Sequence, residues 1–318
     1  MARGKGANQR KKTPRWGSPT SWEELYRAGR LRERFNLLRK AAQTGEIPEA
    51  DYQLGFCYAN GEGTRQDDSL ALVHFQRAAS MGHLGAMFSA GKRLCNGLGA
   101  ARDPAKGIEL YRKAASLGDV PAMFNLGLQL LRGSGPQNPK EGIAWLRRAA
   151  KTGDRDAKVE LGDTYYEGSD VPQDLETALR YYLDAASMGD PHAALRAGFM
   201  LFHGEGCAPD PKRAIPLYRM AAKRGLVEAK YNLGLCYLSG AGVDRDGNAG
   251  LRLLRSAARQ GHVESIWEVA RAHEEGIGGA RRSTRIALRY YLKGAQLGDT
   301  DCSERAKSLG GFSGGRQA

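Results

Sequence analysis

The chain has 318 residues, of which 41% are hydrophobic and 26% are charged, a balance typical of a folded protein and not of a disordered one. No apolar run approaches the roughly 18 residues of a membrane-spanning helix, and Met1 to Arg15 contain no apolar stretch typical of a secretory signal, so we expect a cytoplasmic protein. The formal net charge is +13, and the first fifteen residues supply six of these charges without any acid. We therefore expect a mildly basic body that carries a strongly basic arm.

Residues 1–20 form this arm, and we expect them to be disordered. Arg10, Lys11 and Lys12 are its densest basic cluster, and charge alone would let them make a weak contact with a nucleic acid or an anionic membrane. This gives an alternative function, that of an accessory factor on such a surface. Only one aromatic residue, Trp16, adjoins the cluster, so we do not expect recognition of a base sequence. A solubilising extension without a ligand is the competing interpretation.

Residues 21–46 are expected to form two capping helices. The first runs from about Ser21 to Arg30, with Ser21 and Glu24 placed as a capping box. Apolar residues at helical spacing predict the second helix, and they are Phe35, Leu38, Ala41 and Ala42. Such a pair would cover the open end of a repeat stack.

Residues 47–298 contain an internal repeat, marked by Ala-Ala-x-x-Gly or a close variant of it. Successive marker glycines stand 35 to 37 residues apart throughout, and they are Gly45, Gly82, Gly118, Gly153, Gly189, Gly225, Gly261 and Gly298. So constant an interval over most of the chain predicts a stack of seven similar supersecondary units.

Each unit opens with apolar residues at helical spacing, as in residues 229–239, and we call the helix expected there the A helix. It is expected to end at a Gly-x-Gly step in six units, because glycine enters the left-handed C-cap conformation without steric penalty. The glycines at which the A helices should end are Gly61, Gly97, Gly133, Gly204, Gly240 and Gly276, with a lone Gly168 in the remaining unit.

About four residues later stands a short polar side chain that can accept a hydrogen bond from a free amide at a helix start. These expected N-caps are Asp67, Asp103, Asn138, Asp174, Asp210, Asp246 and Ser283. A second helix, the B helix, should run from the cap through an apolar or aromatic position to the small pair, usually Ala-Ala. Small side chains there would let the B helix approach the next hairpin closely.

The C-terminal part follows the same scheme. Residues 299–309 are expected to form a half repeat with a polar outer face, as a terminal capping helix requires. Residues 310–318 are rich in glycine and are expected to be a flexible tail. We expect the whole chain to be a monomer.

The landmarks Ala-x-x-x-Leu-Gly, Gly-x-Gly, Asp and Ala-Ala-x-x-Gly resemble those of the Sel1-like repeat family, a relative of the tetratricopeptide repeats, over about residues 30–309. The resemblance implies an all-α fold, a right-handed superhelical solenoid of antiparallel helix hairpins whose A helices line a concave groove. It also implies a non-enzymatic scaffold or adaptor that binds a protein or peptide ligand in this groove. One bacterial branch of the family is cysteine-rich, secreted and associated with penicillin binding and β-lactamase activity. The lack of regular cysteine pairs and of an expected signal peptide separates this chain from that branch.

No pattern typical of a catalytic, metal or cofactor site is present. The five cysteines form no close pair, so we expect free thiols and neither a disulfide framework nor a zinc site. The six histidines include no pair three or four residues apart, and we expect them on the surface or in the groove. No Gly-x-Gly extends to a dinucleotide motif, the calcium-like start at Asp244 lacks its later glycine and acid, and no nucleophile elbow occurs. We therefore expect no enzyme activity, cofactor, metal or small-molecule substrate.

The groove is the expected partner-binding site. In each A helix, the residue two positions before the Leu-Gly pair should face the groove, and so should the residues one and two helical turns after it. The residues at these positions include Phe88, Lys92, Phe124, Leu128, Leu131, Tyr166, Phe199, Phe202, Tyr231, Leu238, Trp267 and Arg271. Contiguous apolar surface usually marks an interaction site, and Lys92 and Arg271 would hold acidic groups of the ligand. The competing interpretation is that the apolar residues only pack neighbouring A helices together. Leu131 and Phe202 stand late in their helices, where replacement should disturb packing least.

Overall fold

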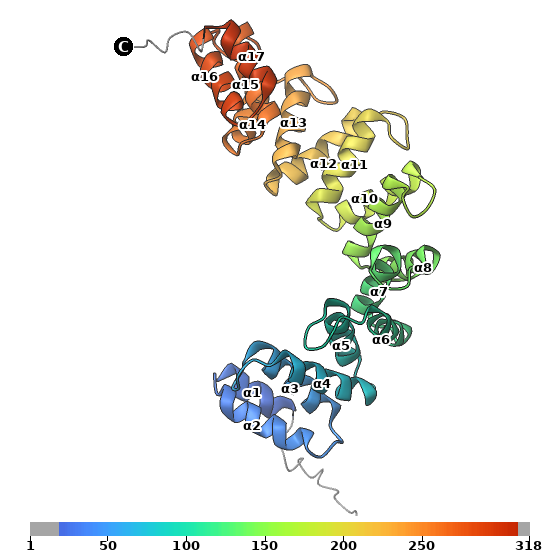
Figure 1. The fold of residues 1–318 in the computed structure, drawn as a ribbon. Helices are drawn as coiled ribbons and strands as arrows, with labels where there is room; N and C mark the ends of the chain where they lie inside the picture. The colour runs from blue at the N-terminus through green and yellow to red at the C-terminus, as the bar shows by residue number, and fades with distance from the viewer. Residues whose placement is uncertain (1–18, 311–318) are drawn as a thin grey trace, which may run out of the picture. The chain divides into compact units, whose positions relative to one another are not determined.

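The computed structural model describes residues 19–310, and this part of the chain forms seventeen helices and no strand (Figure 1). The helices divide between Asp154 and Arg155 into two compact units, which we call the N-terminal unit (α1–α8) and the C-terminal unit (α9–α17). Within each unit every helix packs against the next one in the chain. This is the all-α stack of helix hairpins that the repeat predicts. None of the described helices is both long enough and apolar enough to span a bilayer.

The N-terminal unit starts with α1 (Pro19–Arg27) and α2 (Leu31–Ala42). Its three hairpins pair α3 (Pro48–Asn60) with α4 (Asp68–Ser80), α5 (Leu84–Asn96) with α6 (Pro104–Ser116), and α7 (Val120–Arg132) with α8 (Pro139–Lys151). The C-terminal unit has four hairpins and a final helix: α9 (Arg155–Glu167) with α10 (Leu175–Ser187), α11 (Pro191–His203) with α12 (Pro211–Lys223), α13 (Val227–Ser239) with α14 (Gly247–Arg259), α15 (Val263–Glu275) with α16 (Thr284–Gln296), and then α17 (Thr300–Ser308). Odd numbers from α3 to α15 are A helices and even numbers from α4 to α16 are B helices.

The B helices start where short polar side chains satisfy free amides. All seven predicted N-caps are confirmed, since each side chain accepts a hydrogen bond from the backbone N–H three residues later, as Asp246 does from Ala249 at 2.8 Å. Five further helices have caps that we did not predict. Asp caps α7, α11 and α17, and a histidine imidazole caps α5 and α15. Each such cap typically contributes about 1 kcal/mol.

The A helices end at glycine as predicted, with one exception. Gly61, Gly97, Gly204, Gly240 and Gly276 adopt the left-handed conformation, and so does the lone Gly168, all with φ between 70° and 80°. The prediction is wrong at Gly133, which has φ −73° and ψ 169° and ends α7 in an extended conformation. Glycine is still required there, because a Cβ atom would overlap the carbonyl oxygen of Gln129 one turn earlier.

In six of the seven hairpins the core is an aromatic or leucine side chain of the B helix packed on a glycine of the A helix, and in the α15–α16 hairpin Tyr291 packs beside Ala270 instead. A Cβ atom at Gly162 would lie 2.6 Å from the ring of Tyr182, which shows how closely α9 and α10 approach. Tyr182 is 1% exposed, and burying a side chain of this size contributes about 2 to 3 kcal/mol. The small pair Ala185 and Ala186 is buried beside it, and the same arrangement recurs along both units.

Helices α1 and α2 precede the repeats and α17 follows them, and the first of these helices starts earlier than predicted. Phe35, Leu38, Ala41 and Ala42 are buried on α2 as expected. The capping box is wrong, because α1 already begins at Pro19 and Ser21 therefore lies inside the helix. Most of the arm, with Arg10, Lys11 and Lys12, and the tail beyond residue 310 lie outside the described residues.

Candidate functional site

The A-helix face of the C-terminal unit carries two adjacent hollows. The larger hollow, of about 520 Å³, lies over α11, α13 and the start of α15. Its apolar wall is formed by Leu195, Phe199 and Tyr231, and its polar rim by His192, Arg196, Glu228, Asn232, His262 and Glu264. Phe199 is 38% exposed, so its ring is accessible to a ligand.

The smaller hollow, of about 180 Å³, lies over α13, α15 and the start of α17. Tyr231 and Glu264 line both hollows, so the two are neighbours. Trp267 and Val263 supply apolar surface here. The remaining lining side chains are Glu268, Asp299 and Asp301, so that with Glu264 the hollow has four carboxylates and no lining cation.

Two of these carboxylates already have partners. Asp299 is the N-cap of α17 and accepts from the backbone N–H of Cys302 at 2.7 Å. Glu268 accepts from the Arg271 guanidinium at 2.6 Å, and this hydrogen bond raises the pKa of Arg271. Glu264 and Asp301 are exposed and are therefore the carboxylates best placed to meet a ligand.

His262 is held by the start of α15. Its Nδ1 accepts a hydrogen bond from the backbone N–H of Ser265 at 3.2 Å. A Glu264 oxygen lies 3.4 Å from the same nitrogen, but a nitrogen that accepts from an amide carries no proton to donate to a carboxylate. Because Nδ1 caps the helix, His262 forms no ion pair with Glu264 through this nitrogen.

The Tyr231 hydroxyl stays protonated at neutral pH. Burial raises its pKa, and the nearby Glu268 and Glu264 raise it further. Its ring packs against the His262 imidazole with centroids 4.9 Å apart. The floor shared by the two hollows is thus an aromatic ring with a hydrogen-bond donor at its tip.

The profile of the Sel1 repeat matches the chain seven times, over residues 48–83, 85–119, 120–154, 155–190, 191–226, 227–262 and 263–299. The chain belongs to the Sel1 repeat family. This confirms the resemblance drawn from the sequence landmarks. Sel1 repeat proteins are generally scaffolds for protein interaction and are typically not enzymes.

Solved Sel1-type structures have the same fold. One similar structure is c5321, a protective antigen of uropathogenic Escherichia coli strains with an SLR fold, at 25% identity and a TM-score of 0.81 over 89% of this chain. The present chain spans 61% of the length of that protein. A Sel1 repeat protein from Oxalobacter formigenes is 29% identical with a TM-score of 0.68, and the alignment covers 87% of this chain and 80% of the other. No curated protein sequence matches the chain.

Three of the predicted partner-binding residues come together at the hollows of the Sel1 repeats. Phe199 lines the larger hollow, Trp267 the smaller one and Tyr231 both. Arg271 lines neither hollow, but its guanidinium donates a hydrogen bond to Glu268, which lines the smaller hollow.

Three others in the C-terminal unit contact residues of the B helices and line neither hollow. Phe202 and Tyr166 have their rings 6.5 Å from Tyr218 and Tyr182, respectively. Leu238 packs in the core beside Leu251. They lie outside the two hollows.

In the N-terminal unit the predicted residues are half-buried or exposed on α5 and α7, with one exception. Phe88 packs at the edge of a core cluster, Phe124 and Leu128 are half-buried, and Lys92 is exposed. The expectation for Leu131 is wrong, because this side chain is 2% exposed and packs on the B helix at Gly142. Its replacement would disturb the core and not a groove.

The polar rim was missed, although the repeat contains a signal for it. His192, Glu228 and Glu264 each stand three residues before an apolar residue that lines a hollow (Leu195, Tyr231 or Trp267), so they share its helix face one turn earlier. The three recur at intervals of 36 residues. Extending the predicted groove positions by one helical turn toward the start of each A helix would have identified these three residues.

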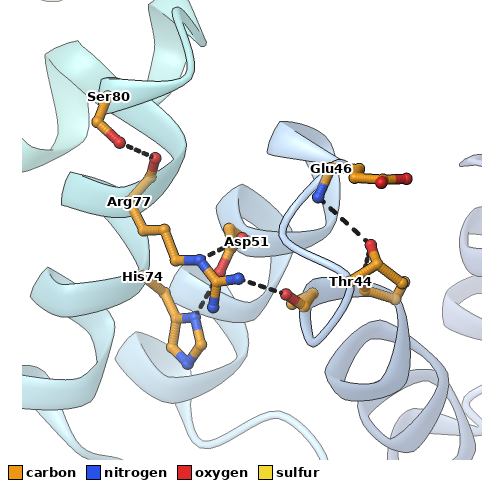
Figure 2. Close-up of polar contacts among 8 residues, drawn as sticks. Thr44, Glu46, Asp51, His74, Arg77 and Ser80 are labelled. Atoms are coloured by element: carbon orange, nitrogen blue, oxygen red, sulfur yellow. Dashed lines mark hydrogen bonds and ion pairs between the residues drawn. The ribbon is translucent and has the colours of Figure 1, made fainter.

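A buried polar cluster in the N-terminal unit was also missed (Figure 2). Asp51 of α3 is fully buried, and its Oδ1 lies 2.8 Å from Nδ1 of His74 on α4. The Nε of Arg77 lies 3.5 Å from the other oxygen, and the same guanidinium donates to the carbonyl of Ala42 at 2.8 Å. Since these contacts join α2, α3 and α4, we assign the cluster to stability.

The cysteines are mostly buried, and the histidines join no metal cluster in the described part of the chain. Four thiols are buried, and burial raises the pKa of Cys57 and Cys236 to about 11, so few thiolates exist at neutral pH. In the described part of the chain no three His, Cys, Asp or Glu side chains are grouped as a metal site. The expectation that the histidines lie on the surface or in the groove is wrong for His273, which is 6% exposed.

Proposed function

We propose that the chain is a non-enzymatic scaffold that binds an extended segment of a partner protein across the two hollows of its C-terminal unit. One observation carries this proposal. Phe199, Tyr231 and Trp267, from three consecutive A helices, line two adjacent hollows and are only partly buried. Partly exposed aromatic side chains in a concave, partly polar site are typical of protein interaction surfaces.

The lining suggests which residues the segment carries. An apolar side chain fits the larger hollow between Phe199 and Tyr231, and a lysine or arginine fits the smaller hollow beside Glu264 and Asp301. Packed helices lie roughly 9 Å apart, and an extended chain advances about 3.3 Å per residue. We therefore expect an apolar and a basic residue about three positions apart in the ligand.

The test is a selection of peptides from a displayed random library on the purified full chain, followed by affinity measurement with the selected peptide. The double variant Phe199→Ser with Tyr231→Ser should weaken binding at least about thirtyfold, because aromatic anchors at an interface typically contribute about 2 kcal/mol. Leu297→Ser removes an exposed apolar side chain directly after α16, outside both hollows, and should leave binding unchanged.

Circular dichroism and size-exclusion chromatography establish that each variant keeps its fold. A selected peptide that binds the double variant as tightly as the parent chain would refute the A-helix site. Enrichment of acidic in place of basic residues would refute the assigned role of Glu264 and Asp301.

A further inference from the structure

Three consecutive B helices of the C-terminal unit carry positive charge without any acid. Helices α12, α14 and α16 contain no Asp or Glu, whereas each of the B helices α4, α6, α8 and α10 contains at least one. The cations are Lys212, Arg213, Arg219, Lys223, Arg252, Arg255, Arg259, Arg285, Arg289 and Lys293. Within the described residues none of them forms an ion pair with a carboxylate. We call this surface the basic B face.

The basic B face contains a hollow of about 490 Å³ between α14, α16 and the end of α15. Its lining is Arg255, Arg259, His273, Ile286, Arg289, Tyr290 and Lys293. Four of these seven side chains are cations and none is a carboxylate. Such a concentration of like charge is unfavourable by itself and attracts anions.

Arg255 is held in this hollow by a neutral partner. The Nδ1 of His273 lies 3.1 Å from the carbonyl oxygen of Arg281, which can only accept, so Nδ1 carries the proton. The Nε2 atom is then an acceptor, and it takes a hydrogen bond from Nη2 of Arg255 at 3.1 Å. His273 thus orients the half-buried guanidinium without neutralising its charge.

The other cations differ in their engagement. Lys293 donates to the carbonyl of Ala258 at 2.6 Å, as Arg77 does to Ala42 at the equivalent place in the N-terminal unit, so it also has a structural role. Arg259 and Arg289 are exposed, and neither has a hydrogen bond or ion pair within the described residues. Of the four cations that line the hollow, these two are the most available to a ligand.

We propose that the basic B face binds the phosphodiester backbone of a single-stranded nucleic acid. Charged side chains repeated over three hairpins suit a ligand with repeated anions better than one isolated phosphate. Arginine predominates in the hollow, and its planar fork matches phosphate oxygens. Tyr290 and Ile286 add apolar surface on which an unpaired base can stack, which a duplex does not offer.

The same face is poorly suited to a membrane. Among the described residues, no large, exposed apolar side chain lies within α12, α14 or α16, and only Leu297 directly follows one of them. A membrane-binding helix needs such side chains to enter the lipid. The charge lies in a recess, where a strand can enter and a flat bilayer cannot.

The test uses the full chain and a fluorescein-labelled 20-nucleotide oligouridine, with anisotropy measured over a range of salt concentrations. The double variant Arg259→Gln with Arg289→Gln should weaken binding at least about tenfold. It should also lower the slope of log K against log salt by about 1.4, since each phosphate contact on a single strand contributes about 0.7. Lys40→Gln with Arg65→Gln removes the same charge from exposed sites of the N-terminal unit and should change affinity less than twofold.

Two further arms separate the alternatives. Arg10→Ala, Lys11→Ala and Lys12→Ala in one variant tests the N-terminal arm, and polyglutamate and phosphatidylserine vesicles test other anionic partners. The proposal is overturned if the arm variant abolishes binding, if the charge-matched control weakens it as much as the double variant, or if polyglutamate or vesicles bind as tightly as the oligonucleotide. Circular dichroism checks that all variants remain helical.

Discussion

Asp51 is a fully buried carboxylate that lies between a half-buried imidazole and a partly exposed guanidinium (Figure 2). Burying a charge is unfavourable unless hydrogen bonds and opposite charges replace the lost water. His74 supplies a hydrogen bond to one oxygen, and Arg77 supplies a positive charge 3.5 Å from the other, which accepts no hydrogen bond within the described residues. Arg77 also reaches the end of α2 through Ala42. Breaking the cluster should therefore loosen three helices together.

Asp51→Ala is expected to lower the free energy of unfolding by about 2 kcal/mol, because a hydrogen bond to a charged group contributes about that much. Asp51→Asn keeps an oxygen that can accept from His74 and should lose less. Denaturant unfolding followed by circular dichroism measures both variants. Equal losses in the two would mean that packing, and not the polar contact, accounts for the effect.

Single residues were the hardest scale to predict, as Leu131 shows. Helical spacing placed it on a common face with Phe202, but Leu131 packs against Gly142 of the following B helix. Cys95 and Leu238 lie against Gly107 and Gly250 in the same way. A glycine on the partner helix makes room for a buried side chain, and helical periodicity within one helix cannot show which neighbour supplies that room.

At the scale of helices and loops, local chemistry made prediction reliable. The B-helix N-caps are short polar side chains whose bond lies within four residues, so tertiary structure hardly affects them. His83 and His262 act as caps through Nδ1, a less common use of histidine that composition alone does not reveal.

The second glycine of the Gly-x-Gly step has a role that only the structure shows. At Gly206 the φ angle is +73°, and a Cβ atom would overlap the backbone of Leu175 at the start of α10, in the preceding hairpin. The glycine thus lets the loop of one repeat lie directly on the helix start of the repeat before it. The same contact recurs at Gly242 against Pro211.

Gly206→Ala should therefore destabilise the chain by about 2 kcal/mol or more, through backbone strain and the clash together. Gly29→Ala is the matched control, since Gly29 has nearly the same positive φ, of +70°, but no atom lies near its missing Cβ. It should show only the strain of about 1 kcal/mol. The midpoints of guanidinium unfolding compare the two, and a loss at Gly29 as large as that at Gly206 would rule out the clash.

On the scale of the whole molecule, the repeat predicted the fold class because each hairpin contacts mainly its neighbours. The division into two compact units at Asp154 was not predicted. The marker glycines keep the same spacing across this boundary, so they do not indicate where the boundary lies. Of the two hollows, only the three aromatic residues that line them were predicted. The hollows themselves were not, because a hollow depends on which neighbouring side chains are short.

Because each hairpin contacts mainly its neighbours, we can predict how the chain tolerates the loss of one repeat. Deleting residues 191–226 removes α11 and α12 and brings α10 directly before α13, which meets the same kind of B-helix surface that α12 presents to it. The deletion also places Asp190, the cap of α11, before α13, which has no side-chain cap of its own. The shortened chain should therefore keep the oligomeric state of the full chain and lose helical ellipticity only in proportion to its length.

Deleting residues 191–208 is the control, because it removes α11 and most of its loop and leaves the B helices α10 and α12 in direct succession. The face of α12 that packed on α11 then has no A helix to cover it, so exposed apolar surface should cause aggregation. Size-exclusion chromatography with light scattering distinguishes the two outcomes. If the full-repeat deletion aggregates as the half-repeat deletion does, then contacts beyond the nearest hairpin contribute substantially to the stability of the C-terminal unit.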